Sequence, residues 1–210
     1  MHFHIITLFP KAFDSYLSES ILKRAIENKK IKVSFYNPRD FVKNKWKKVD
    51  RPPYGGGPGL VVEALPVIKA IAKAKGKKNA KILFLSPSGK QFTNNYAAKV
   101  AKKYKHVVII CGRYEGVDAR VKKVFKMDEI SIGPFVSTGG ELPAMMIMDV
   151  MARQVPGVLG NPESIEERRV SSSEVYTRPE VFKHKGKSYR VPKVLLSGHR
   201  AKIEEWKKKR

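Results

Sequence analysis

Apolar segments of strand length alternate with longer amphipathic segments along most of this chain, and this alternation constrains the fold more than any other feature. The segments at 2–9 (HFHIITLF), 81–86 (KILFLS) and 106–111 (HVVIIC) are apolar at successive positions rather than at every second one. Strands that are buried on both faces have this pattern, and they are typical of parallel sheets. We therefore expect an α/β fold with a parallel sheet that helices cover on both sides.

The segments between these strands predict the helices of the fold. In the first of them, Phe13, Leu17, Ile21 and Ala25 recur at four-residue spacing, which favours one apolar helix face. Pro66 fits the helix at 63–75 only in its first turn. A long loop at 37–60 indicates a functional or mobile segment. Two further strands are expected at 31–36 and 128–133. The five expected helices lie at 11–28, 63–75, 93–104, 118–125 and 141–154.

The composition changes after residue 155 and divides the chain. Residues 1–155 are expected to form the main domain, and the polar, turn-rich segment 156–177 reads as an interdomain linker. Residues 178–210 predict a small, mostly helical domain with a short helix near 179–183, an extended segment at 185–196 and a final helix with Ser197 as its N-cap. Since so short a segment cannot bury a core alone, it must pack on the first domain or on a second subunit.

A strong excess of positive charge limits the partners of this protein. The formal net charge is +24 and the isoelectric point is about 10.1. Such a charge attracts phosphate polymers through counterion release. RNA is the favoured partner if a catalytic pocket accompanies the charge, although charge alone does not separate RNA from DNA. The alternative is a lysine-rich solvated surface without a nucleic-acid partner.

Other parts of the composition exclude several classes of protein. No apolar run approaches the ~20 residues that a membrane-spanning helix needs. The N-terminal segment MHFHIITLFP starts a strand at once, so we expect no targeting leader, no membrane association and a cytoplasmic protein. Cys111 is the only cysteine, which excludes an intramolecular disulfide. Its place at the end of an apolar strand indicates a small buried hydrophobic residue rather than a nucleophile.

Three loops rich in glycine and proline follow or adjoin expected strands. They are LSPSGK (85–90), CGRYEG (111–116) and SIGPFVSTGGELP (131–143). Glycine allows close approach and positive φ, and proline fixes a turn, so such loops expose backbone hydrogen-bonding groups. One such loop is commonly a plain turn. Three at one edge of a sheet would form a pocket that binds a small cofactor through its main chain.

Six ordered segments carry a resemblance to a known family. They are similar in order and spacing to the bacterial tRNA (guanine-N1)-methyltransferase family, TrmD. The segments are YGGGPG (54–59), LSPSGK (85–90), CGRYEGVDARV (111–121), DEISIGPFVSTGGELPAM (128–145), RQVPGVLGNPES (153–164) and YTRPE (176–180). The resemblance implies a SPOUT-type α/β sheet with a C-terminal trefoil knot. It also implies a homodimer whose active site lies at the subunit interface. The implied reaction transfers the methyl group of S-adenosylmethionine to N1 of the guanosine next to the anticodon, tRNA position 37, with Mg²⁺ involvement.

The resemblance also implies which residues bind the cofactor. Relatives commonly carry tyrosine where Phe135 stands. Tight packing turns are the other interpretation of Gly139 and Gly140. The cofactor-binding residues implied by the three loops are Leu85, Ser86, Pro87, Gly112, Tyr114, Glu115, Ile132, Gly133, Pro134, Phe135, Val136, Ser137, Gly139, Gly140 and Pro143.

Methylation of guanine N1 requires a base, because this nitrogen normally carries a proton, and a cation near O6 would stabilise the developing negative charge. The resemblance assigns the cation role to Arg153, which alternatively interacts with a helix C-terminus. Glu115 is a candidate Mg²⁺ ligand, or else a cap of the following turn. The family's usual aspartate is missing, and an ungapped count places Arg168, which cannot accept a proton, at its position. Glu167, with Glu166 behind it, is then the candidate base; the alternative is a solvated acidic turn.

Two other functions stay open at this point. One is a different SPOUT RNA methyltransferase that acts on a ribose or another base. The other is a non-catalytic basic RNA-binding protein. For a tRNA methyltransferase, the basic cluster at 43–51 and the C-terminal residues 207–210 would suit the backbone of the anticodon stem-loop, although solvated lysines are the commoner meaning of such runs.

Overall fold

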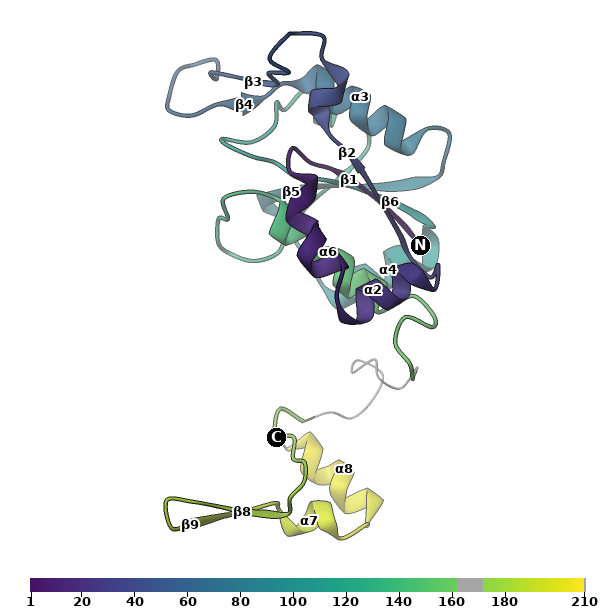
Figure 1. Cartoon of the computed structure of the whole chain (residues 1–210), viewed down its shortest axis with the longest axis vertical. Helices are drawn as coiled ribbons and strands as arrows, with labels where there is room; N and C mark the ends of the chain where they lie inside the picture. The colour runs from purple at the N-terminus through teal and green to yellow at the C-terminus, as the bar shows by residue number, and fades with distance from the viewer. Residues whose placement is uncertain (162–171, 210) are drawn as a thin grey trace. The chain divides into compact units, whose positions relative to one another are not determined.

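The computed structural model describes residues 1–161 and 172–209, in two units (Figure 1). The first unit comprises Met1–Gly160 and the second Asn161–Arg210. In the described part of the chain, no helix combines the length and the apolar character that crossing a membrane requires.

The first unit contains a five-stranded sheet in which every neighbouring pair of strands is parallel. The strand order is β2-β1-β6-β5-β7. The predicted α/β fold with a parallel sheet is therefore confirmed, whereas the trefoil knot stays a prediction. The five strands are β1 (His2–Ile6), β2 (Lys32–Tyr36), β5 (Ala80–Gln91), β6 (His106–Ile110) and β7 (Asp128–Ser131).

Helices cover both faces of this sheet, as the strand pattern predicts. On one face, Phe3 and Ile5 of β1 pack in a core with residues of α2, α4 and α6. On the other, Ile6 and Ile110 pack with residues of α3 and α5. Figure 1 shows α2, α4 and α6 together on one side of the sheet and α3 on the other. These helices are α2 (Ser20–Glu27), α3 (Ala64–Lys75), α4 (Asn94–Lys103), α5 (Val121–Val124) and α6 (Glu141–Ala152).

The predicted helix at 11–28 is broken in the structure. A 3-10 turn η1 (Pro10–Phe13) and a short helix α1 (Asp14–Leu17) precede α2. The two helices are separated at Ser18 and Glu19, and Glu19 is extended, with φ of −124° and ψ of 152°. Ser20, the first residue of α2, has a φ of 50°, so the two helices present different faces. As a result Leu22 is buried, whereas Ile21, expected on the apolar face, is exposed.

The loop expected at 37–60 contains secondary structure of its own. It includes a 3-10 helix η2 (Pro38–Phe41) and the strand β3 (Asp50–Arg51), which pairs antiparallel with β4 (Val61–Val62). The glycine run YGGGPG lies between β3 and β4. Pro66 lies in the first turn of α3, as predicted.

The second unit combines a hairpin with two helices. The prediction of a helix near 179–183 is wrong, because β8 (Val181–His184) pairs antiparallel with β9 (Lys187–Arg190). The segment expected to be extended ends in a short helix, α7 (Lys193–Leu196), before α8 (Arg200–Lys208). Ser197 is not the N-cap of α8: its hydroxyl donates to the Val194 carbonyl, and His199 precedes the helix.

Candidate functional site

A cavity of about 260 Å³ lies where β5, β6 and β7 are followed by the three glycine-rich loops. The carboxyl ends of parallel strands are the usual place for ligand sites in α/β sheets. Its volume is just below the ~300 Å³ at the lower end of small-molecule pockets. The lining residues are Leu85, Ser86, Pro87, Gly112, Arg113, Tyr114, Glu115, Gly116, Ile130, Ser131, Ile132, Phe135, Val136, Ser137, Thr138, Gly139, Gly140 and Pro143.

Every residue expected to bind the cofactor lines this cavity except Gly133 and Pro134. Gly133 is buried behind the wall, and its N–H donates to Ser131 Oγ at 3.2 Å. A side chain at position 133 would overlap the Phe135 ring, so this glycine shapes the cavity without lining it. The expectation missed Arg113, Gly116, Ile130, Ser131 and Thr138, which lie in or next to the same loops and carried no separate signal.

The first loop is a bulge within β5 rather than a turn after it. The predicted strand ends at residue 86, but β5 continues to Gln91, and both Leu85 and Lys90 pair with Ile130 of β7. Gly89 makes this possible, because a Cβ there would lie 2.5 Å from the Ile130 backbone nitrogen. The bulge turns Leu85, Ser86 and Pro87 into the cavity wall.

The second loop makes a tight turn at its centre. Tyr114 has a φ of 59°, and the Gly116 N–H closes the turn on the Arg113 carbonyl at 3.0 Å. The Glu115 N–H donates to the Leu60 carbonyl at 3.0 Å. A Cβ at Gly59 would lie 2.6 Å from Glu115 Oε1, so the end of the YGGGPG run packs directly on the Glu115 side chain. This contact joins the long 37–60 loop to the cavity.

The third loop packs backbone to backbone on the second. Gly139 and Arg113 form an isolated antiparallel bridge, and the Gly140 N–H donates to the Gly112 carbonyl at 2.9 Å. A Cβ at Gly140 would lie 2.6 Å from Cys111 Cα. Position 140 therefore requires glycine, in agreement with the interpretation of Gly139 and Gly140 as a tight packing turn. Gly139 and Gly140 also line the cavity.

An ion pair supports this wall from inside the protein. Arg113 Nε lies 2.8 Å from Glu141 Oε2, and the Glu141 side chain is 3% exposed. The other carboxylate oxygen accepts a 2.7 Å hydrogen bond from Thr7 Oγ1, at the end of β1. The Arg113 guanidinium also lies over the Phe9 ring, 4.6 Å from its centroid. Burial, followed by the Glu141 charge, raises the pKa of the Cys111 thiol, which agrees with an inert buried cysteine.

Among the described residues that are expected to carry the chemistry, Glu115 lines the cavity and Arg153 does not. Arg153 follows the last turn of α6 and is not among the cavity residues. Pro143, which does line the cavity, is ten residues earlier on the same helix, so Arg153 is about 15 Å away along the axis at ~1.5 Å per residue. Among the residues that the structure describes, Glu115 is the only acidic one in the cavity lining. Glu166 and Glu167 lie outside the described residues.

A parallel α/β sheet with a glycine-walled cavity at its carboxyl edge is typical of α/β proteins that bind a small ligand. Residues 1–210 match the family model described as tRNA (Guanine-1)-methyltransferase TrmD, and the chain belongs to this family. This confirms the predicted family and, by homology, the predicted tRNA (guanine-N1)-methyltransferase activity.

Curated relatives match over nearly the full chain, and each carries the name tRNA (guanine-N(1)-)-methyltransferase. The protein of Caldanaerobacter subterraneus subsp. tengcongensis is 46% identical, covering 100% of this chain and 86% of the relative. That of Clostridioides difficile is 44% identical, covering 99% and 91%. That of Campylobacter jejuni subsp. doylei is 43% identical, covering 99% and 90%.

Proposed function

We propose that this protein transfers a methyl group from S-adenosylmethionine to N1 of the guanosine next to the anticodon, and that the cavity of the three loops holds the methyl donor. Membership of a methyltransferase family implies this donor. The observation that carries the proposal is that three loops distant in sequence supply one continuous cavity lining.

The chemistry of the lining suits the parts of this donor. Leu85, Ile132 and Phe135 offer apolar surface for an adenine ring and a thioether. Gly112, Gly139 and Gly140 bring peptide groups close to the ligand, since no side chain separates them from it. The Arg113–Glu141 ion pair fixes the position of these peptide groups from behind.

A second copy of this chain would complete the site. Arg153 lies about 15 Å along α6 from Pro143, so we assign its role near guanine O6 to the cavity of another protomer. Leu142 and Met146, one helical turn apart on α6, are 64% and 53% exposed. This apolar surface is of the kind that a homodimer buries. Arg153 of one protomer would then stabilise negative charge developing on the guanine held by its partner.

A Mg²⁺ ion fits the cavity only in a limited way. Mg²⁺ is commonly held by one or two carboxylates together with waters and oxygens of the substrate. Glu115 is the single carboxylate of the lining, so an ion here would take most of its ligands from water or substrate. When bound, it would supply positive charge near the substrate, and Glu115 would orient it.

Glu167, or Glu166 behind it, is proposed as the base that removes the N1 proton. Glu167→Gln is expected to lower the methyl-transfer rate at neutral pH and to leave S-adenosylmethionine affinity nearly unchanged. The matched variant Glu166→Gln shows which of the two acts. If neither change lowers the rate, the base is another group.

The basic second unit is proposed to bind the anticodon stem-loop. On its hairpin, Phe182 and Tyr189 stack with ring centroids 5.1 Å apart and are 54% and 46% exposed. Lys183, Lys187 and Arg190 lie on the same two strands. Exposed aromatic rings beside basic side chains are typical of surfaces that bind RNA.

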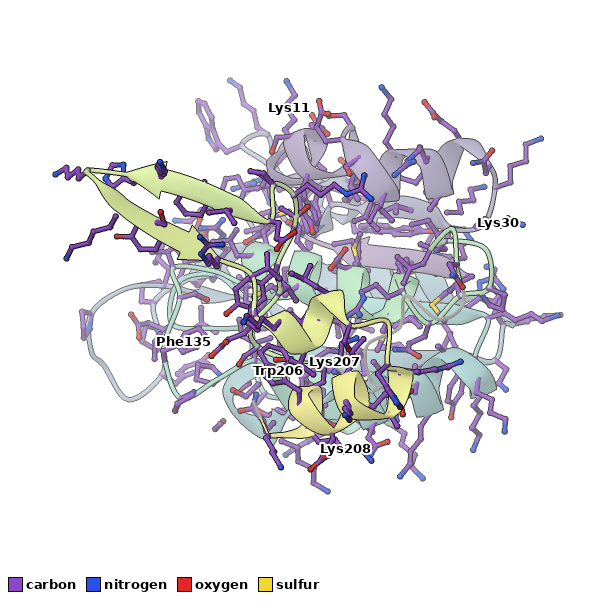
Figure 2. The ribbon with its side chains drawn as sticks, turned by 90° about the horizontal axis from the view of Figure 1, so that it is seen from below. Lys11, Lys30, Phe135, Trp206, Lys207 and Lys208 are labelled. Atoms are coloured by element: carbon purple, nitrogen blue, oxygen red, sulfur yellow. The ribbon has the colours of Figure 1, made fainter. Side chains whose placement is uncertain are left out.

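The first unit contributes to the positive surface as well. Figure 2 shows the labelled Lys11 and Lys30 pointing outward from its ribbon, and both side chains are exposed. A net charge of +24 would attract the phosphate backbone of a tRNA substrate.

The direct test incubates the protein with methyl-labelled S-adenosylmethionine and a tRNA transcript. We expect label in a transcript with guanosine next to the anticodon and none in a matched transcript with adenosine there. Equal labelling of both transcripts would place the reaction on another nucleotide or a ribose. Absence of labelling together with retained tRNA binding would favour a non-catalytic RNA-binding protein.

A further inference from the structure

Three histidines form a cluster remote from the methyl-donor cavity. His2 and His4 lie on the same face of β1, two residues apart, and His106 at the start of β6 pairs in register with His2. They share this face with Ile6, whose core includes α3. The cavity lies at the opposite, carboxyl end of these parallel strands.

The ring nitrogens of the cluster converge. His4 Nε2 and His106 Nδ1 lie 3.2 Å apart, and each of the three histidines offers one nitrogen so that these atoms all lie within 4.8 Å of one another. Two imidazole nitrogens bound to one tetrahedral Zn²⁺ at ~2.0–2.1 Å are about 3.3–3.4 Å apart. The His4–His106 separation is therefore close to that of two ligands of a single ion.

Hydroxyl groups hold the outer nitrogens of two rings. His4 Nδ1 lies 3.1 Å from Tyr36 Oη, and His2 Nε2 lies 2.9 Å from Ser34 Oγ, both from β2. Hydrogen bonds of this kind orient the imidazoles of metal sites and fix the tautomer that leaves the other nitrogen free to coordinate. If His4 donates its Nδ1–H to Tyr36, its Nε2 carries the lone pair that faces His106.

The exposure of the rings also suits a metal. His4 is 1% exposed, whereas His2 and His106 are only partly buried. An ion bound here would reach solvent and could take a water as its fourth ligand.

We propose that His2, His4 and His106 form a binding site for a divalent transition metal ion of the Zn²⁺ type, at the end of the sheet opposite the methyl-donor cavity. Nitrogen ligands without carboxylates select such ions over Mg²⁺. The charges of Lys32, Lys78, Lys105 and the N-terminus near the cluster oppose a dication and weaken the site. Zn²⁺ bound here would tie β1 to β6.

The test titrates ZnCl₂ into full-length protein without a histidine tag. Calorimetry is expected to show saturable binding of one Zn²⁺ per chain, and Co²⁺ in its place should give the visible absorption of a four-coordinate ion. His106→Gln is expected to weaken Zn²⁺ binding by more than about tenfold. The matched variants His184→Gln and His199→Gln, from the second unit, should bind as the unaltered chain does.

Equal binding by His106→Gln, or loss of binding in His184→Gln or His199→Gln, would overturn the proposal, as would a titration without saturation. A second measurement needs no variant. In protein carrying ¹⁵N-labelled histidine, Zn²⁺ should shift the ring nitrogens of His2, His4 and His106 and leave those of His184 and His199 in place. A shift confined to the last two histidines would contradict the site.

Discussion

Arg113 Nε lies 2.8 Å from Glu141 Oε2, at the point where the loop after β6 meets the first turn of α6. This pair connects two of the three loops that line the cavity, and through Thr7 it also connects them to β1. It holds the backbone of the cavity wall from the protein interior and contributes one residue, Arg113, to the lining. The binding surface therefore depends on a buried charge that does not itself line the cavity.

Glu141→Gln is expected to destabilise the first unit. The change removes one charge of a largely buried pair and leaves the Arg113 guanidinium, 25% exposed, without its counter-ion. Loss of one partner of such a pair costs about 3 kcal/mol. Urea unfolding followed by circular dichroism measures the difference. The control is Glu205→Gln, which removes an exposed pair with Lys209 on α8 and should leave the transition unchanged. Equal effects of the two changes would contradict this role of Glu141.

Gly140→Ala is expected to weaken S-adenosylmethionine binding by about tenfold or more. The new Cβ would lie 2.6 Å from Cys111 Cα and 2.9 Å from the Gly112 nitrogen, so the backbones of two loops must separate. The matched control is Gly160→Ala, where a Cβ would meet nothing within 4 Å. Calorimetric titration with S-adenosylmethionine compares them. Similar affinities for both variants would show that the donor binds away from these loops.

Asp128→Asn is expected to change the acid stability of the sheet. Burial opposes ionisation of Asp128, but hydrogen bonds from Lys81 and Tyr96 outweigh it and lower the pKa of the carboxyl. Since this pKa is lower in the folded state, the carboxylate stabilises the protein fully above the unfolded pKa near 4, and this contribution is lost as the pH falls below it.

The measurement for this prediction is the thermal midpoint of both proteins between pH 7 and pH 3. Asp128→Asn should melt at a lower temperature at pH 7, and the difference should shrink in acid. A difference that does not depend on pH would mean that the charge of Asp128 is not what matters.

Met146→Asp is expected to convert a dimer into monomers and to abolish methyl transfer. Met146 is half exposed on α6, and a carboxylate buried in an apolar interface is costly. Leu65→Asp is the matched control, because Leu65 is also exposed, on the first turn of α3. Sedimentation at micromolar concentration distinguishes the two states. An active, stable monomer of the unaltered chain would rule out the shared site.

Local sequence pattern predicted the sheet and its two covered faces, because apolar runs of strand length leave few other folds. The same pattern did not predict secondary structure that depends on contacts distant in the sequence or on single backbone angles. The break between α1 and α2, where Glu19 is extended and Ser20 has a φ of 50°, leaves the apolar periodicity of 11–28 unchanged and so gives no signal in the sequence. In the second unit, the segment from Val181 forms a strand because it pairs with Lys187–Arg190, and a short polar segment gives no strong signal for either structure.

The sequence analysis predicted the loops that line the cavity more completely than the ion pair that supports them. Glycines and the apolar positions beside them were evident in the sequence, and most of them line one cavity. Arg113 was missed, since a basic residue in a basic chain carries no signal until its partner is known. Glu141, 28 positions later by residue number, belongs to the third loop and begins the expected helix, and neither place predicts a pair with Arg113. Pairing across such a separation becomes visible only when the fold brings both ends together.

The position of the methyl group in the product tests the proposed methyl transfer most directly. Purified protein is incubated with S-adenosylmethionine and an unmodified tRNA, and nuclease fragments of the product are sequenced by mass spectrometry. We expect a single added methyl on the base of the guanosine next to the anticodon, with the yield sharply reduced in Gly140→Ala and retained in Gly160→Ala. A methyl on a ribose or on a different nucleotide, or equal yields from the two variants, would contradict it.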